Sequence, residues 1–162
     1  MRWLRHMTAE ARVRRRFPRA VLDAIQHAVA DGERRHSGQV CFAIEPSLPW
    51  RDLASGRTPR ERAHEAFAQL RVWDTEHNSG VLIYVLTAER AIEIVADRGI
   101  AARVGQNEWQ AICDRMRDRF AAGDFERGAI DGVNAVSDIL AREFPDDGSA
   151  RSNELADEPI IL

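Results

Sequence analysis

Acidic and amide side chains alternate in a short polar segment that precedes an apolar run. Asp74, Glu76 and Asn78 occupy every second position before the apolar run 81–86, and Asp97 follows a second run. If the two runs form antiparallel strands, the start of the first and the end of the second meet at one edge of a sheet. Oxygen ligands of this kind suit Ca²⁺, which takes about six to eight of them. We therefore predict a divalent-cation site, with Ca²⁺ as its ion, formed by Asp74, Glu76, Asn78 and Asp97.

A purely structural role for the same residues is the alternative. Asp74 and Asn78 would then cap the turn, because short polar side chains hydrogen-bond to nearby backbone groups. Asp97 and Arg98 would form an ion pair on the surface, which contributes little to stability. Both interpretations place the four residues at the same edge of the sheet.

Two further ligand sets are open. His36, His77 and Asp97 could hold zinc, although no cysteine is expected beside them. The carboxyl ends of parallel strands are the usual ligand-binding edge of an open α/β sheet. A second acidic cluster is expected at that edge, formed by Glu45, Glu89 and Asp124.

No complete catalytic motif accompanies these clusters, so enzymatic activity is left open. Cys113 and Arg119 have the spacing of a cysteine phosphatase, but they fall inside a predicted helix with Cys113 on its apolar face. Two hydroxyl side chains have a histidine close by in the sequence, yet neither pair has a third group to orient the base. These pairs are Ser37 with His36 and Thr75 with His77.

Strand and helix patterns alternate along the chain and position these residues. Thr58, Pro59 and Glu61 form the start signal of a helix with a capping box. A strand, helix, strand unit favours a parallel pair, and the following hairpin makes the sheet mixed. The apolar strands require helices on both faces, which predicts a three-layer α/β/α sandwich. The expected helices are 18–32, 58–71, 105–122 and 124–144, and the expected strands are 39–44, 81–86 and 91–96.

Charge divides the chain into three parts, expected at 1–17, 18–145 and 146–162. Residues 1–19 hold seven arginines and one acid, whereas the remainder holds 16 arginines and 25 acids. The basic arm predicts a partner: a protein, an anionic membrane surface or the chain's own acidic tail. Nucleic acid is disfavoured because the body is acidic and lacks interleaved aromatic residues. The apolar end of the tail, 159–162, is expected to dock on the domain or on a neighbour.

The cellular compartment is expected to be the cytoplasm, peripheral to the membrane. No apolar run approaches the ~20 residues of a transmembrane helix, and the basic start lacks the apolar core of a signal peptide. Cys41 and Cys113 fall in apolar patterns and are predicted to be buried thiols. Trp73 and Trp109 are predicted to anchor the core.

Four segments within residues 18–145 carry a resemblance to known proteins: HSGQVCFAIE, ERAHEAFAQLRVWDTEHNSGVLIYVL, AIEIVADRGIAARVGQNEW and FAAGDFERGAIDGVNAVSDIL. On these segments, the chain resembles the TPM-domain family. The resemblance implies a Rossmann-like α/β/α fold with a small mixed sheet. It also implies calcium binding, work on membrane complexes, or acid phosphatase activity.

Together, the residues and the resemblance favour a soluble accessory or interaction module that binds a divalent cation and works at a membrane surface. The alternative is a metal-assisted acid phosphatase, a phosphomonoesterase that would use the same ion. Many members of the family carry a signal peptide and a membrane anchor, and neither is expected here.

Overall fold

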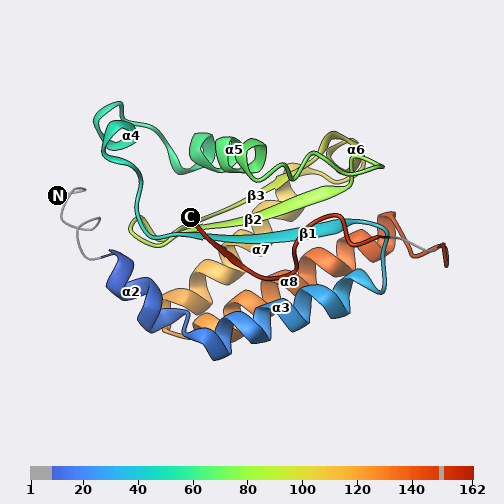
Figure 1. Ribbon diagram of the computed structural model, residues 1–162, viewed down its shortest axis with the longest axis horizontal. Coiled ribbons are helices and arrows are strands. Elements are labelled where there is room, and N and C mark those ends of the chain that lie inside the picture. The colour runs from blue at the N-terminus through green and yellow to red at the C-terminus, as the bar shows by residue number, and fades with distance from the viewer. Residues whose placement is uncertain (1–8, 150–151) are drawn as a thin grey trace.

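A four-stranded mixed sheet lies at the centre of the computed structural model, which describes residues 9–149 and 152–162 (Figure 1). The strands are β1 (Gln39–Glu45), β2 (Gly80–Leu86), β3 (Ala91–Ala96) and β4 (Ile160–Ile161), in the order β3-β2-β1-β4. β1 is parallel to β2 and to β4, and β2 is antiparallel to β3. The predicted α/β class and mixed sheet are therefore confirmed.

Helices cover both faces of this sheet. Figure 1 shows α3 (Arg19–Glu33), α7 (Gln106–Ala121) and α8 (Phe125–Glu143) on one face. On the other face lie α5 (Pro59–Gln69) and two short helices, α4 (Trp50–Ala54) and α6 (Arg98–Ala101). The first described helix, α2 (Ala9–Arg16), lies beside one end of the sheet. None of the helices in the described part of the chain is long and apolar enough to cross a bilayer.

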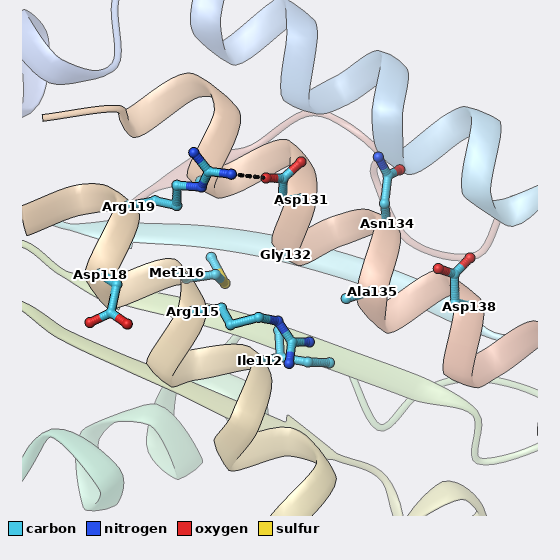
Figure 2. Close-up of a pocket in the computed structure, with 11 residues that line it drawn as sticks. Ile112, Arg115, Met116, Asp118, Arg119, Asp131, Gly132, Asn134, Ala135 and Asp138 are labelled. Carbon is cyan, nitrogen blue, oxygen red and sulfur yellow. Dashed lines mark ion pairs between the residues drawn. The ribbon is translucent and has the colours of Figure 1, made fainter. Parts of the chain in front are cut away.

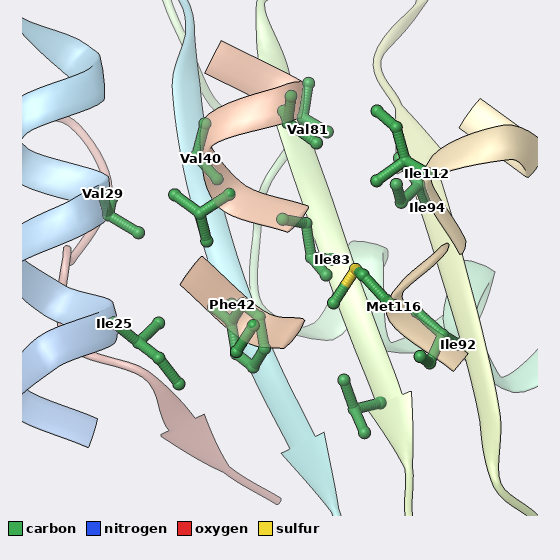
Figure 3. Close-up of a cluster of buried hydrophobic side chains, with 14 of the residues drawn as sticks. Ile25, Val29, Val40, Phe42, Val81, Ile83, Ile92, Ile94, Ile112 and Met116 are labelled. Carbon is green, nitrogen blue, oxygen red and sulfur yellow. The ribbon is translucent and has the colours of Figure 1, made fainter. Parts of the chain in front are cut away.

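Two hydrophobic clusters, one on each face, hold the layers together. β1 and β2 are buried along their whole length, so their alternating side chains enter both clusters. Figure 3 shows the larger cluster, in which Ile25 and Val29 of α3 and Met116 of α7 face Phe42 and Ile83 of the strands. Strands buried on both faces read as continuous apolar runs, which is the pattern that the sequence has.

Glycines allow α7 and α8 to pack closely. A Cβ atom at Gly132 would lie 2.3 Å from the sulfur of Met116, and one at Gly128 would lie 2.8 Å from the ring of Phe120. A groove of about 570 Å³ runs along the outer side of this contact, bordered by an ion pair between Arg119 and Asp131 (Figure 2). The small residues in the groove are therefore explained by the packing of the two helices.

Several local predictions are confirmed. Thr58 caps α5, accepting a hydrogen bond from the backbone of Glu61, whose carboxylate accepts one from the backbone of Thr58. Cys41 and Cys113 are buried free thiols. The apolar end of the tail docks on the domain, because β4 pairs with Ala43 and Ile44 of β1.

Three other local predictions were wrong. Trp73 is 48% exposed instead of anchoring the core, and the Arg71 guanidinium lies over its ring. Gly32, which we expected to end a helix, lies inside α3, where a Cβ would clash with the Ser137 hydroxyl. The segment 47–57, which lies outside the expected helices and strands, contains helix α4. The short helix α6 is one that the sequence patterns do not indicate.

The basic arm is partly docked on the domain. Val13 of α2 and the following Phe17 are buried in the larger cluster, and the Phe17 ring meets Phe120 and Phe125 edge to face. The Arg19 guanidinium lies 2.8 Å from Glu158 of the acidic tail. Residues 1–8 of the arm lie outside the described part of the chain.

A buried polar network ties the end of β1 to α5. The guanidinium of Arg62 donates to both carboxylate oxygens of Glu45 at 2.9–3.1 Å, and the Tyr84 hydroxyl donates to the same carboxylate. All three side chains are at least nine-tenths buried. Arg62 also donates to Glu65 and Gln69, so its charge is fully compensated.

Replacing Arg62 with Met is expected to lower the free energy of unfolding by about 3 kcal/mol, because it leaves the Glu45 carboxylate buried without its counter-charge. Urea denaturation measures this change. The double variant Glu45→Gln/Arg62→Met should be more stable than Arg62→Met alone, since a neutral amide is cheaper to bury. Equal losses in the two variants would contradict the role assigned to the pair.

Candidate functional site

The predicted site lies where β2 begins and β3 ends, as the antiparallel pairing requires. Val81 is paired with Ala96, and the backbone N–H of Asp97 donates to the Gly80 carbonyl at 2.9 Å. Asp97 therefore stands directly beside the loop 71–79 that leads into β2. Figure 1 shows this loop and α6 together at one end of the sheet.

Backbone contacts fix the shape of this loop. Arg71 and Asn78 adopt left-handed conformations, with φ of 54° and 50°. The Thr75 hydroxyl accepts a hydrogen bond from the Ser79 N–H at 2.9 Å, so this hydroxyl stabilises the turn and is not a free nucleophile. At Gly80 a Cβ would lie 2.0 Å from the Val72 carbonyl oxygen, which leaves room for glycine alone. The loop is thus closed tightly onto the start of β2.

Asp97 has an unusual environment at this edge. Its Oδ1 atom accepts a hydrogen bond from the Arg98 N–H at 2.7 Å and caps α6. Its Oδ2 atom is buried and has no hydrogen-bond partner among the described residues, while the residue as a whole is 9% exposed. Burying a carboxylate oxygen without a partner costs free energy. A hydrogen-bond donor or a cation beside the Oδ2 atom would offset this cost.

Two backbone carbonyls lie against the same turn of α6. A Cβ at Gly99 would lie 2.6 Å from the Asn78 carbonyl oxygen and 3.0 Å from that of His77. Glycine at this position therefore allows the loop to bring two oxygen atoms up to the first turn of the helix that Asp97 caps. Backbone carbonyls are ordinary ligands of Ca²⁺.

The other predicted ligands have different surroundings. Asp74 forms an ion pair with Arg71 on the surface. The side chain of Glu76 is 79% exposed, and its backbone N–H donates to the Glu154 carboxylate at 3.0 Å. Asn78 contributes to the loop through its left-handed backbone. The surface ion pair that we considered between Asp97 and Arg98 is replaced by the cap of α6.

The remaining clusters considered from the sequence do not assemble. The described residues contain no group of three or more His, Cys, Asp or Glu side chains placed to hold a metal ion. Glu45 is engaged by Arg62, Asp124 lies 3.8 Å from Arg119, and His36 is buried while His77 is largely exposed. A cation at Asp97 would therefore need backbone carbonyls and water beside the carboxylates.

The two thiols are unsuited to nucleophilic chemistry. Cys113 lies within α7, as the helical pattern predicts, and not in a loop that could hold phosphate. Burial raises the pKa of Cys113, and also that of Cys41, to about 12. The spacing between Cys113 and Arg119 is therefore fortuitous, because a thiol that keeps its proton is a poor nucleophile.

The C-terminal tail contributes residues to this edge that sequence reasoning missed. The Gln39 side-chain oxygen, at the start of β1, accepts hydrogen bonds from the backbone N–H groups of Glu154 and Leu155, each at 3.0 Å. The Glu154 carboxylate in turn accepts a hydrogen bond from the backbone N–H of Glu76 in the loop 71–79. These contacts join residues more than 70 positions apart, and no local pattern signals them.

A buried carboxyl group stands behind the tail. Glu33, at the end of α3, accepts a hydrogen bond from the Val40 N–H at 2.7 Å. Burial, with a smaller contribution from Asp157 of the tail, raises the pKa of Glu33 from its ordinary 4.5 to about 8. Glu33 therefore keeps its proton at neutral pH in the folded chain.

This carboxyl group predicts a pH-dependent stability. The unfolded chain releases the Glu33 proton near its ordinary pKa and the folded chain releases it near pH 8, so the folded state binds more protons between these values. The free energy of unfolding is expected to fall as the pH rises from about 5 to about 8. Urea denaturation of the wild type and of Glu33→Gln across this range would measure the effect, and the glutamine variant should lose this part of the slope. Identical pH profiles would contradict the prediction.

Comparison with known proteins places this fold among solved relatives. A family model described as the TPM domain matches residues 16–139. The NMR structure of the BA42 protein from the psychrophilic bacterium Bizionia argentinensis is similar, with 26% identity and a TM-score of 0.74 over 88% of this chain and 93% of that one. The N-terminal domain of a P. gingivalis protein shares the fold at 21% identity, with a TM-score of 0.57 over 74% and 76% of the two chains. No curated protein matches the sequence.

Proposed function

This chain belongs to the TPM-domain family, and on that basis we propose that it binds a divalent cation, Ca²⁺ first of all, and acts as an accessory or interaction module. The ion would bind at the edge formed by the loop 71–79 and the first turn of α6. The observation that carries the proposal is the buried Oδ2 atom of Asp97, which lacks a hydrogen-bond partner in the described part of the chain.

The local chemistry fits a hard cation. Asp97 offers a carboxylate oxygen that is buried from water. The carbonyls of His77 and Asn78 lie close to Gly99, which belongs to the helical turn that Asp97 caps. A cation there would offset the cost of burying the carboxylate oxygen. Oxygen ligands that combine carboxylate, carbonyl and water are what Ca²⁺ requires.

The remaining ligands would come from side chains of the same loop, of which Glu76 is exposed and Asn78 is partly buried. Glu76 precedes the two residues that supply the carbonyls, and its exposed side chain can reorient without breaking a buried contact. Asp74 would first have to leave Arg71, so we assign it the weakest contribution. A bound cation supplies positive charge that could join this acidic edge to a carboxylate or phosphate of a partner.

The basic helix α2 supports work at an anionic surface. Arg14 and Arg15 are exposed on this helix, whereas Val13 and Phe17 anchor it to the core. Basic residues held near an anionic membrane contribute about 1 kcal/mol each to binding. We propose that α2 brings the domain to such a surface while the cation edge, at the other end of the sheet, stays available to a partner.

Isothermal titration calorimetry with Ca²⁺, carried out on the whole chain and on its Asp97→Asn variant, tests the proposed site. We expect the wild type to bind Ca²⁺ and the variant to bind at least about tenfold more weakly, a loss of about 1.4 kcal/mol, because one anionic ligand is removed. The matched control is Asp118→Asn, which removes the same charge from an exposed position on α7. Absence of binding heat in the wild type, or equal losses in both variants, would refute the site.

A second variant tests the carbonyl ligands without changing the charge. Gly99→Ala places a methyl group within 3 Å of both carbonyl oxygens and must displace them. We expect weaker Ca²⁺ binding with little loss of helix stability, since alanine favours helix over glycine. Unchanged affinity in Gly99→Ala, with a loss in Asp97→Asn, would remove the carbonyls from the ligand set.

The rival function, a metal-assisted phosphomonoesterase, would use the same ion. It predicts divalent-dependent hydrolysis of an aryl phosphate that is lost in Asp97→Asn and retained in Asp118→Asn. Calcium binding without turnover would support the accessory role.

A further inference from the structure

A second cavity opens at the opposite end of the sheet, beyond the carboxyl ends of the parallel strands. It has a volume of about 320 Å³ and lies between the turn that follows β2, the end of α2 and the junction of α7 with α8. Figure 1 shows α2 and the turn between β2 and β3 at this end, away from α6. The carboxyl ends of parallel strands are the edge at which open α/β sheets bind ligands.

Aromatic side chains form the apolar wall of the cavity. Phe17, Phe120 and Phe125 meet one another, with ring centroids 5.1–5.9 Å apart. Each ring comes from a different segment: Phe17 directly follows α2, Phe120 lies at the end of α7 and Phe125 begins α8. The cavity therefore exists because α2 docks on the domain and adds the third ring.

Arginine side chains supply the polar part of the lining. Arg16, Arg90 and Arg117 all contribute, one each from α2, the β2–β3 turn and α7. Arg16 lies over the Phe125 ring, with its guanidinium carbon 4.9 Å from the centroid. Arg117 forms an exposed ion pair with Asp114. In the described part of the chain, neither Arg16 nor Arg90 has a carboxylate within ion-pair distance.

The surroundings of Arg16 are unfavourable to its charge. Partial burial, together with the neighbouring Arg12 and Arg90, lowers the pKa of Arg16 from its ordinary value. Guanidinium groups keep their charge in proteins, so their mutual repulsion persists at neutral pH. An anion placed among them would relieve it and accept hydrogen bonds in a fork geometry suited to carboxylate and phosphate.

We propose that this cavity binds an amphiphilic anion, with its phosphate or carboxylate group held by Arg16, Arg90 and Arg117 and its apolar part against the three phenylalanine rings. The volume admits a compact apolar group in addition to the anionic one. Such a molecule could be free in solution or form the exposed part of an anionic lipid. The site is separate from the cation edge and does not depend on it.

Calorimetric titration of the whole chain with octyl phosphate tests the site. We expect binding by the wild type and a loss of about tenfold in Arg90→Gln, since one charge-assisted contact is removed. Arg90 is exposed in a turn, so this variant should keep the fold, which the thermal melting curve verifies. Arg16→Gln should weaken binding similarly. The matched control is Arg98→Gln, an exposed arginine at the other edge, which should leave the affinity unchanged.

Two comparison probes separate the parts of the proposal. Inorganic phosphate and octanol should each bind at least about tenfold more weakly than octyl phosphate, because each makes only one kind of contact. Absence of octyl phosphate binding would overturn the proposal. So would equal binding of inorganic phosphate, or an equal loss in Arg98→Gln and Arg90→Gln.

Vesicle sedimentation identifies the source of the anion. Pelleting with vesicles that contain phosphatidic acid, but not with phosphatidylcholine alone, would assign the site to lipid if Arg90→Gln reduces it and Arg98→Gln does not. Octyl phosphate binding without such pelleting would assign it to a free amphiphile. Either result supports the cavity. Neither probe contains calcium, so failure here is distinct from failure of the cation site.

Discussion

β1 and β2 are buried on both faces, and this burial decides where the other elements must lie. No side of either strand can face water, so α3, α7 and α8 cover one face and α5 covers the other. The lateral edges must be closed as well: β3 completes one and the C-terminal β4 completes the other. Even the polar residue at the end of β1, Glu45, is buried, and it is accommodated by Arg62 and Tyr84.

The two ends of the parallel pair differ in chemistry. At the starting end, where the acidic tail contacts the loop 71–79, lies a carboxylate whose Oδ2 atom has no partner among the described residues. At the finishing end, arginines gather around an aromatic wall. The acidic region and the basic region thus lie at opposite ends of the strands. Two ligands of opposite charge could therefore bind without competing. The sequence carries the same asymmetry as a basic arm and an acidic body.

Local signals in the sequence account for much of the fold. The capping box at Thr58 and Glu61, the hairpin of β2 and β3, and the position of Asp97 at the edge all follow from patterns within a few residues of each other. The alternation of Asp74, Glu76 and Asn78 predicts converging side chains. In the structure, Asp74 forms an ion pair with Arg71, and Asn78 adopts a left-handed backbone conformation. What could not be predicted are contacts across long stretches of chain, such as Glu154 with Glu76, or Arg16 with Phe125.

The last strand gives the sheet one edge that is only lightly held. β4 pairs with β1 at two positions, Ala43 and Ile44, and the Leu162 N–H donates to the Ile44 carbonyl at 2.9 Å. Other contacts of the tail involve side chains such as Gln39 and Arg19. Protein structures open locally where few buried contacts resist, with free energies well below that of global unfolding. Detachment of β4 would uncover the backbone of β1 and the part of the smaller cluster against which Ile160 and Leu162 pack. A local opening of this kind would turn β1, whose central residues are all apolar, from an interior strand into an open edge of the sheet.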